Sequence, residues 1–167
     1  MRSVASRRFE FLSVLRLAAY RRYWLGLVAS VTSHQAMITA KGWLVYDITG
    51  EEMALGLVAA AQAIPAIVFN LVAGALADRI DPRRLIVIGE TSAAFLMLIL
   101  GILVLSDKIE VWHIIVASFL TGVATSLDQP ARRVIWPALI DRSQFMYATA
   151  LNQGVWSGTR VFAPMIA

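Results

Sequence analysis

The sequence contains no cysteine and few charged residues, and each shortage excludes a class of protein. Without cysteine the chain can form neither a disulfide nor a thiolate metal site. Charged residues make up 16% of the chain and apolar residues 59%. A soluble domain has roughly 25% charged and roughly 45–50% apolar residues. The apolar excess comes in blocks of about 20 residues, the length of a transmembrane helix. The sequence therefore predicts an all-α membrane protein.

The motifs that mark common enzymes are also missing. We find no nucleophile elbow, no phosphate-binding loop, no metal-spaced histidine pair and no paired carboxylates. The two histidines, His34 and His113, belong to different apolar blocks. We therefore expect no enzyme activity, no metal and no cofactor, and no ATP-driven transport within this chain.

The net charge of +4 and the isoelectric point near 10.0 could indicate a nucleic-acid partner. The basic residues, however, cluster at the ends of the apolar blocks, where membrane topology explains them. We expect the lipid bilayer as a partner, and no nucleic acid.

Five helices are expected, with ranges of about 24–46, 54–77, 85–105, 111–127 and 144–167. Pro65 lies in the middle of the second helix and is expected to kink it, because proline removes one backbone hydrogen bond. Pro130 and Pro137 are expected to end the fourth helix and to interrupt a polar segment that follows it.

Residues 1–22 form a basic, partly amphipathic segment, which we expect on the cytoplasmic membrane surface. Residues 23–167 are expected to form the membrane domain. The fifth helix is still apolar at Ala167, whereas a spanning helix normally ends with interfacial residues. We therefore expect a piece of a longer protein, cut inside this helix. A natural short product that ends in a half-helix is the alternative.

The basic residues lie almost entirely on one side of the expected topology. That side holds twelve arginines: Arg2, Arg7, Arg8, Arg16, Arg21, Arg22, Arg79, Arg83, Arg84, Arg132, Arg133 and Arg142. The other side holds Lys108 and several acidic residues. By the positive-inside rule, the sequence predicts a multi-pass protein of the plasma membrane with a cytoplasmic N-terminus.

A charged turn between the second and third expected helices carries a recognisable spacing. Gly74, Asp78, Arg79, Arg83 and Arg84 match the pattern of the signature loop between helices 2 and 3 of the major facilitator superfamily, and the turn resembles that loop. Two positions depart from the pattern, with Asp81 where it has glycine and Pro82 where it often has a basic residue. These departures keep the Asp-Arg pair and make the turn stiffer.

Other stretches resemble one branch of that superfamily, the bacterial exporters that include the enterobactin exporter and drug efflux proteins. They are 42–46 with Thr49-Gly50, 54–58, 119–124, 128–132 and 150–152. Residues 160–164 are similar to the start of the antiporter motif, with Ala163 in place of glycine. The resemblance implies a fold of 12 helices in two halves, of which helices 1–4 and part of 5 are present here. It further implies that the other half is a partner.

The resemblance also implies a role for the loop. Asp78 would face a helix N-terminus of the opposite half, and Arg79, Arg83 and Arg84 would supply ion pairs, when the cytoplasmic side is closed. Such a contact, made in one state only, biases the transport equilibrium. The alternative is a solvated loop whose surface pairs contribute about 0–1 kcal/mol each. Asp128 and Arg132, at the cytoplasmic end of the fourth helix, are expected to pair as Asp78–Arg132 or Arg79–Asp128.

Polar side chains inside helices are candidates for the substrate or proton pathway, because charges in hydrocarbon are costly. They are His34, Gln35, Lys41, Glu90, Asn152 and Arg160. Lys41 could instead extend to the outer interface near Tyr46, His34 could form only a helix–helix hydrogen bond, and Glu90 could pair with a loop arginine. Arg160 stays charged and could hold a carboxylate or an anionic substrate.

Three further residues concern the fifth helix. Gly154 and Gly158 form a Gly-x-x-x-Gly pair that lets a neighbouring helix approach closely, and with Pro164 they fit a bending helix.

The resemblance to bacterial exporters implies a secondary active transporter that exports a small amphiphilic molecule, a drug or siderophore-like compound, in exchange for protons. The alternative is a non-transporting membrane subunit or an inactive truncated product.

Overall fold

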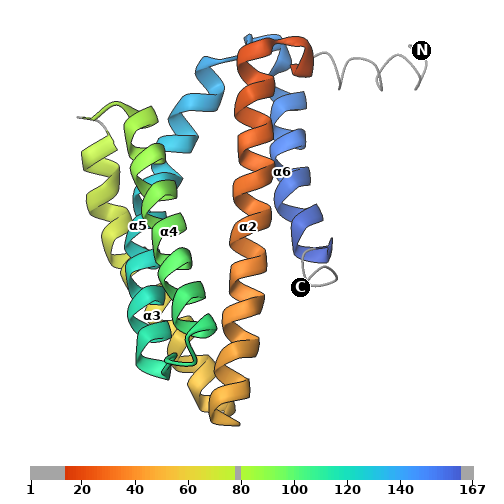
Figure 1. Cartoon of the computed structure of the whole chain (residues 1–167). Coiled ribbons are helices and arrows are strands. Elements are labelled where there is room, and N and C mark those ends of the chain that lie inside the picture. Colours follow the sequence, from red (N-terminus) through yellow and green to blue (C-terminus); the bar gives the residue numbers. More distant parts are fainter. Residues whose placement is uncertain (1–13, 78–79, 163–167) are drawn as a thin grey trace. The chain divides into compact units, whose positions relative to one another are not determined.

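The computed structural model describes residues 14–77 and 80–162, apart from the side chains of 71–77, 143 and 160–162. Regular structure in this part is entirely helical (Figure 1). In chain order, the elements are η1 (Val14–Arg16), α2 (Ala18–Thr49), α3 (Glu52–Ala77), α4 (Pro82–Leu105), α5 (Val111–Ala138), η2 (Arg142–Gln144) and α6 (Phe145–Phe162). The predicted all-α class is confirmed.

Three segments of the described chain are long and apolar enough to cross a membrane. They are Glu52–Asn70 in α3, Pro82–Leu105 in α4 and Val111–Ala138 in α5. Each of the α3 and α4 segments has only 17% of its most apolar window buried inside the structure. The outward apolar side chains are those that lipid would cover.

The chain divides into two compact units, which are described separately. The four-helix unit comprises residues 37–134, and the terminal unit comprises residues 1–36 and 135–167. The helices α2 and α5 each contribute to both units.

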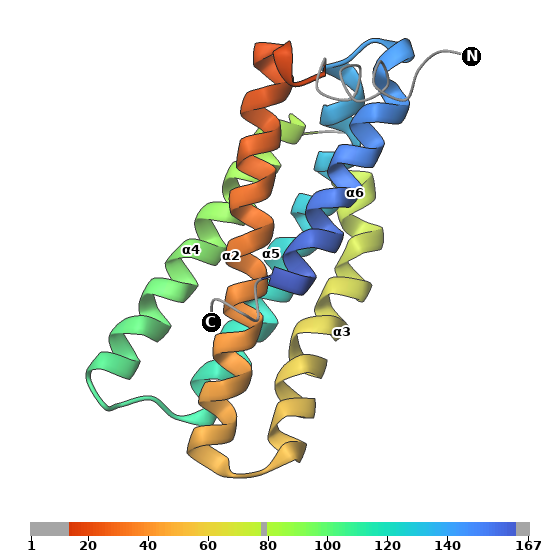
Figure 2. The same ribbon diagram turned by 90° about the vertical axis from the view of Figure 1, so that its right-hand side faces the viewer.

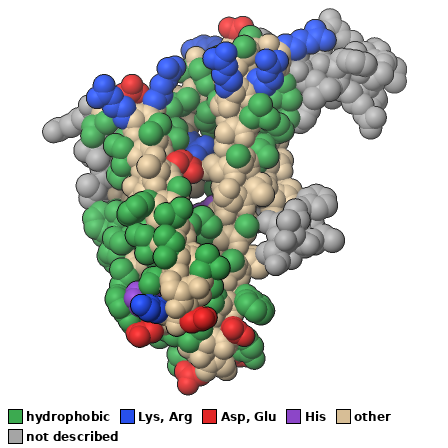
Figure 3. All heavy atoms as spheres, viewed as in Figure 1, with side chains coloured by type: hydrophobic (Ala, Val, Ile, Leu, Met, Phe, Trp, Pro, Cys, Tyr) green, Lys and Arg blue, Asp and Glu red, His purple; other side chains and the backbone are tan. Residues whose placement is uncertain are grey.

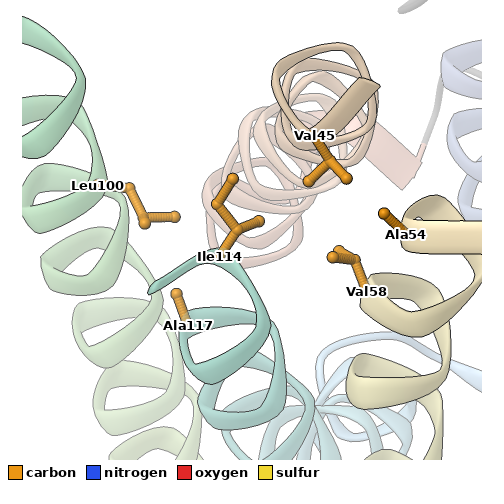
Figure 4. Packing of buried hydrophobic residues seen from close by; sticks show 6 residues of the cluster. All are labelled: Val45, Ala54, Val58, Leu100, Ile114 and Ala117. Atoms are coloured by element: carbon orange, nitrogen blue, oxygen red, sulfur yellow. The ribbon is translucent and has the colours of Figure 1, made fainter. Parts of the chain in front are cut away.

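In the four-helix unit, successive helices run in alternating directions (Figures 1 and 2). Gly50 joins the end of α2 to α3 with a φ of +67°, a conformation that glycine adopts without strain. A core cluster at this end contains Val45, Ala54, Val58, Leu100, Ile114 and Ala117. Figure 4 shows these side chains converging from α2, α3, α4 and α5. The cluster therefore holds all four helices together.

The start of α4 differs from the prediction. We expected this helix from residue 85, but it begins at Pro82, with Asp81 as its N-cap. Asp81 Oδ1 accepts a hydrogen bond of 2.9 Å from the backbone N–H of Arg83. Aspartate is a preferred N-cap and proline a preferred first helical residue. Asp81 and Pro82, which depart from the signature loop pattern, thus form the start of a helix. Arg83 and Arg84 consequently lie in the first turn of α4.

The end of α5 also differs. The predicted helix stopped at 127, whereas α5 continues through Pro130 and Pro137 to Ala138. One proline removes only one backbone hydrogen bond, and membrane helices tolerate this loss. An ion pair between Asp128 and Arg132 spans Pro130 and supports the helix across it. The segment 128–138 is therefore helix rather than loop.

The terminal unit is built on contacts between the first part of α2 and α6. Val14, Tyr20 and Ala148 are fully buried in one cluster, and Leu27, Val31 and Val155 form a second. The Tyr20 hydroxyl donates hydrogen bonds of 3.2 Å to the Ala148 carbonyl and to Asn152 Oδ1.

The predicted segment 1–22 is partly described by the structure, and its location at the membrane surface stays a prediction. Residues 18–22 belong to α2, and Val14 and Tyr20 lie in the core of the terminal unit. Val14 is buried in this core, and Leu15 packs against it.

Candidate functional site

Lys41 is a buried cation in the four-helix unit. Its residue is 5% exposed, and its Nζ donates to Gln62 Oε1 on α3 at 3.1 Å and to Ser118 Oγ on α5 at 3.0 Å. Ser118 is fully buried. Among the described residues, no carboxylate forms an ion pair with Lys41. The amine is therefore held by two neutral polar groups, at the meeting point of three helices.

An apolar layer lies on one side of this lysine site. Val45 follows Lys41 by one helical turn, Val58 precedes Gln62 by one turn, and Ile114 precedes Ser118 by one turn. Because α2 runs opposite to α3 and α5, all three residues lie toward the Gly50 turn. The apolar cluster thus separates the lysine site from that end of the unit.

A close helix contact lies on the other side. At Gly122, one turn beyond Ser118, an added Cβ would lie 2.8 Å from Pro65 Cγ and would clash with the backbone oxygen of Gln62. Pro65 follows Gln62 by three residues and is fully buried in the same contact. The contact fixes α3 against α5 and so positions Gln62 and Ser118 around the amine.

The structure shows which way the Lys41 side chain points, for which the sequence allowed two directions. Lys41 turns inward between helices instead of extending to the interface near Tyr46. Sequence reasoning missed Gln62, Ser118 and Gly122. Each of these residues is a polar residue or a glycine within an apolar helix. Such residues also occur wherever membrane helices hydrogen-bond or pack closely, so the sequence alone could not single out these three.

A second polar site joins the first half of α4 to the second half of α5. Arg132 on α5 donates to Glu90 on α4 at 2.5 Å and to Asp128, one turn earlier on α5, at 2.6 Å. The side chains of Arg132 and Asp128 are 11% and 14% exposed, whereas that of Glu90 is 43% exposed. Glu90 therefore pairs with an arginine, as one of the two alternatives predicted, although this arginine lies in α5 and not in a loop.

Helix packing supports this second site. An added Cβ at Gly89 would lie 3.0 Å from the Ala124 backbone oxygen and 3.5 Å from Asp128 Cβ, so α4 and α5 meet closely there. Asp128 Oδ1 is buried and has no hydrogen-bond partner among the described residues. The predicted pairs Asp78–Arg132 and Arg79–Asp128 involve Asp78 and Arg79, which lie outside the described residues.

The remaining candidates of the predicted pathway lie elsewhere. His34 and Gln35 are half-buried on α2, in the terminal unit. Asn152 accepts the Tyr20 hydrogen bond there, which ties α6 to α2. Arg160 lies in the last turn of α6, and its side chain is outside the described part.

The structure describes most of the glycines and prolines that we expected to bend or pack helices. Nothing lies within 4 Å of an added Cβ at Gly154 or Gly158, so the described residues make no close helix contact at this pair. α3 runs through Pro65 and Gly74 without ending. Pro164 is not among the described residues. No group of three or more His, Asp or Glu side chains in the described part could hold a metal ion.

Long apolar helices with outward apolar faces, and a largely buried arginine paired between two of them, define an integral membrane protein of the polytopic helical class. A sequence model of the family described as transmembrane secretion effector, within the major facilitator superfamily, matches residues 10–167. The chain belongs to this family, as the predicted resemblance to major facilitator exporters implied.

Individual relatives are transport proteins. The chain is 22% identical over 144 residues to macrolide efflux protein A of Streptococcus pyogenes, covering 86% of this chain and 36% of the relative. It is 29% identical over 126 residues to the staphyloferrin A transporter of Staphylococcus aureus, covering 75% and 32%. It is 27% identical over 142 residues to multidrug efflux pump Tap of Mycolicibacterium fortuitum, covering 78% and 34%.

The chain thus spans about a third of the length of the curated relatives it matches. These names indicate transporters, not enzymes. No solved structure matches the chain significantly.

Proposed function

We propose that the protein containing this chain is a secondary active exporter of a small amphiphilic molecule, a drug or a siderophore-like compound. The observation that carries the proposal is the match of residues 10–167 to the transmembrane secretion effector family. Relatives named for macrolide efflux, multidrug efflux and staphyloferrin A transport support a small-molecule cargo. A proton gradient is the proposed energy source, without a cofactor, and this chain itself contains no nucleotide-binding loop.

The proposed location is the plasma membrane of a bacterium, with the N-terminus in the cytoplasm. Twelve arginines on one side of the expected topology support this orientation. In the four-helix unit, Figure 3 shows Lys and Arg side chains gathered at the end where α4 begins and Asp and Glu side chains gathered mainly at the opposite end. The end with the Arg132 site would therefore face the cytoplasm.

In an alternating-access cycle, the Arg132 site would work with the loop that carries Asp78 and Arg79. Its ion pairs join α4 to α5 about two turns into α4, the helix that follows that loop in the sequence. Contacts made by Gly74–Arg84 in one state only would bias the equilibrium between cytoplasmic-closed and cytoplasmic-open forms. The substrate would bind between this half and the other half of the protein.

The test uses the whole gene product in inverted bacterial membrane vesicles whose interior is acidified. Three probes are compared: the cationic dye ethidium, a macrolide and a citrate-type siderophore. We expect at least one probe to accumulate inside, and the accumulation to collapse when a protonophore is added. Vesicles without the protein are the control. If the protein is inserted but none of the three probes accumulates, the export proposal is contradicted and a non-transporting membrane subunit is favoured.

A further inference from the structure

We propose that Lys41 is a proton-carrying site, whose amine is protonated and deprotonated as the transporter changes state. This inference rests on the proposed proton-driven export and adds the residue that would bind the proton. Its basis is the arrangement around Nζ: a titratable amine, 5% exposed, held by Gln62 Oε1 and Ser118 Oγ.

The two partners suit both protonation states of the amine. Charged Lys41 donates to Gln62 Oε1 and to Ser118 Oγ, as the structure shows. Neutral Lys41 can keep its bond to Gln62 while its lone pair accepts a hydrogen bond from the Ser118 hydroxyl, which can donate or accept. A carboxylate partner would instead fix the charge on the amine. The site therefore loses or gains a proton without repacking.

The charged state leaves one N–H of the ammonium without an acceptor among the described residues. A cation buried in apolar surroundings without a counter-charge is costly, and lysine readily changes its protonation under such conditions. The step is simple: an N–H bond breaks, the electron pair stays on Nζ, and a water molecule in the transport pathway takes the proton. Reprotonation is the reverse.

Other ionisable groups on the packed helices lie well away along their axes. The nearest on α5 is His113, about 7.5 Å from Ser118 by helical rise. On α2, Tyr46, Asp47 and His34 are displaced from Lys41 by about 7.5 Å, about 9 Å and about 10.5 Å, and Tyr46 is 52% exposed. The others are displaced further or belong to the second polar site: Glu52 on α3, Glu90 on α4, and Asp128 on α5. Lys41 thus titrates with neutral polar neighbours.

Access to the amine is gated by packing. The apolar layer of Val45, Val58 and Ile114 separates the lysine site from the Gly50 end of the unit. In the proposed orientation that end is the outer side, so this state excludes outside protons from Lys41. A proton enters from outside only when the layer opens, which is the property that exchange of a proton for cargo requires.

The first test observes the proton directly and does not depend on transport. The whole protein is labelled with ¹⁵N-lysine in micelles, and the signal that disappears in Lys41→Met is assigned to Lys41. We expect this signal to change from ammonium to amine between mildly acidic and mildly alkaline pH. The signal of the exposed Lys108, assigned with Lys108→Met, is the reference recorded in the same spectra. A Lys41 signal that stays ammonium throughout overturns the proposal.

The second test separates coupling from binding, with ethidium in inverted vesicles as the probe. Lys41→Met and Lys41→Arg should both lose uphill accumulation, to the level of vesicles without protein, while keeping energy-independent exchange of the dye. Lys108→Met should accumulate the dye like the unaltered protein. If Lys41→Arg keeps uphill accumulation, a permanent positive charge suffices, and Lys41 is an anchor for an anionic group instead. If the unaltered protein moves no probe, the export proposal fails while the titration still decides the protonation of Lys41.

Discussion

Gly122 on α5 faces Pro65 on α3 across a contact that leaves no room for a methyl group. An added Cβ would lie 2.8 Å from Pro65 Cγ, and Pro65 itself is fully buried. The contact lies one turn from Ser118, beside the Lys41 site, so close packing and the polar site depend on the same pair of helices.

Replacing this glycine should therefore destabilise the protein. We expect Gly122→Ala to lower the free energy of unfolding by about 1–3 kcal/mol, the usual cost of overpacking a tight contact. The measurement is the melting temperature of the purified protein. Gly101→Ala in α4 is the matched control, because nothing lies within 4 Å of its added Cβ. Alanine favours a helix by about 1 kcal/mol over glycine, so the control should melt no lower than the unaltered protein. Equal melting temperatures of Gly122→Ala and Gly101→Ala would contradict the close contact between Gly122 and Pro65.

Arg132 should matter more than its partner Glu90. In Arg132→Gln, the Asp128 carboxylate stays buried without its cation, and breaking a buried ion pair costs about 3–5 kcal/mol. In Glu90→Gln, the side chain altered is 43% exposed, and an exposed pair contributes about 0–1 kcal/mol. Melting temperatures should rank the variants in this order. Adding Asp128→Asn to Arg132→Gln should restore much of the loss, and a double variant as unstable as Arg132→Gln would show that the buried charge is not the cause.

The N-cap of α4 gives a third prediction. Asp81→Ala removes the acceptor for the Arg83 N–H and should cost about 0.5–2 kcal/mol. Hydrogen exchange at the Arg83 amide should become faster. Asp81→Asn keeps a capping oxygen and is the control, which should exchange nearly as slowly as the unaltered protein. Fast exchange in both variants would instead indicate that the aspartate charge, and not the cap, protects this amide.

Tyr20 gives a fourth prediction, in the terminal unit. Tyr20→Phe removes the hydroxyl that donates to the Ala148 carbonyl and to Asn152 Oδ1, and should cost about 0.5–1.5 kcal/mol. The control is Tyr46→Phe, because Tyr46 is 52% exposed. A melting temperature lowered only in Tyr20→Phe supports the hydrogen bonds, and an equal effect of both changes contradicts them.

The helical class was predictable because a run of about 20 apolar residues is the length of a membrane-spanning helix. The helix ends were less predictable. At α4, Asp81 and Pro82 were interpreted as departures from a family loop, although an aspartate before a proline is also a helix start. At α5, Pro130 was interpreted as a helix end, but the pair Asp128–Arg132 continues the helix through it.

The candidate sites were predictable only in part. A lysine inside a helix is recognisable from sequence, but its direction depends on what neighbouring helices offer. Gln62 and Ser118 decide the direction of Lys41, and they come from helices 21 and 77 residues away in the chain. The partners of Arg132 show the same difficulty, since the spacing from Asp128 is local whereas Glu90 is 42 residues distant.

The chain's only two lysines have opposite surroundings, Lys41 being buried and Lys108 exposed in the turn between α4 and α5. Amine-reactive reagents need solvent contact, so among the side-chain amines of this chain Lys108 alone offers a ready labelling position. A reagent that cannot cross lipid, added to intact cells, would then report on which side of the bilayer this turn lies. The burial of one lysine makes the other a reporter of sidedness that requires no engineered cysteine.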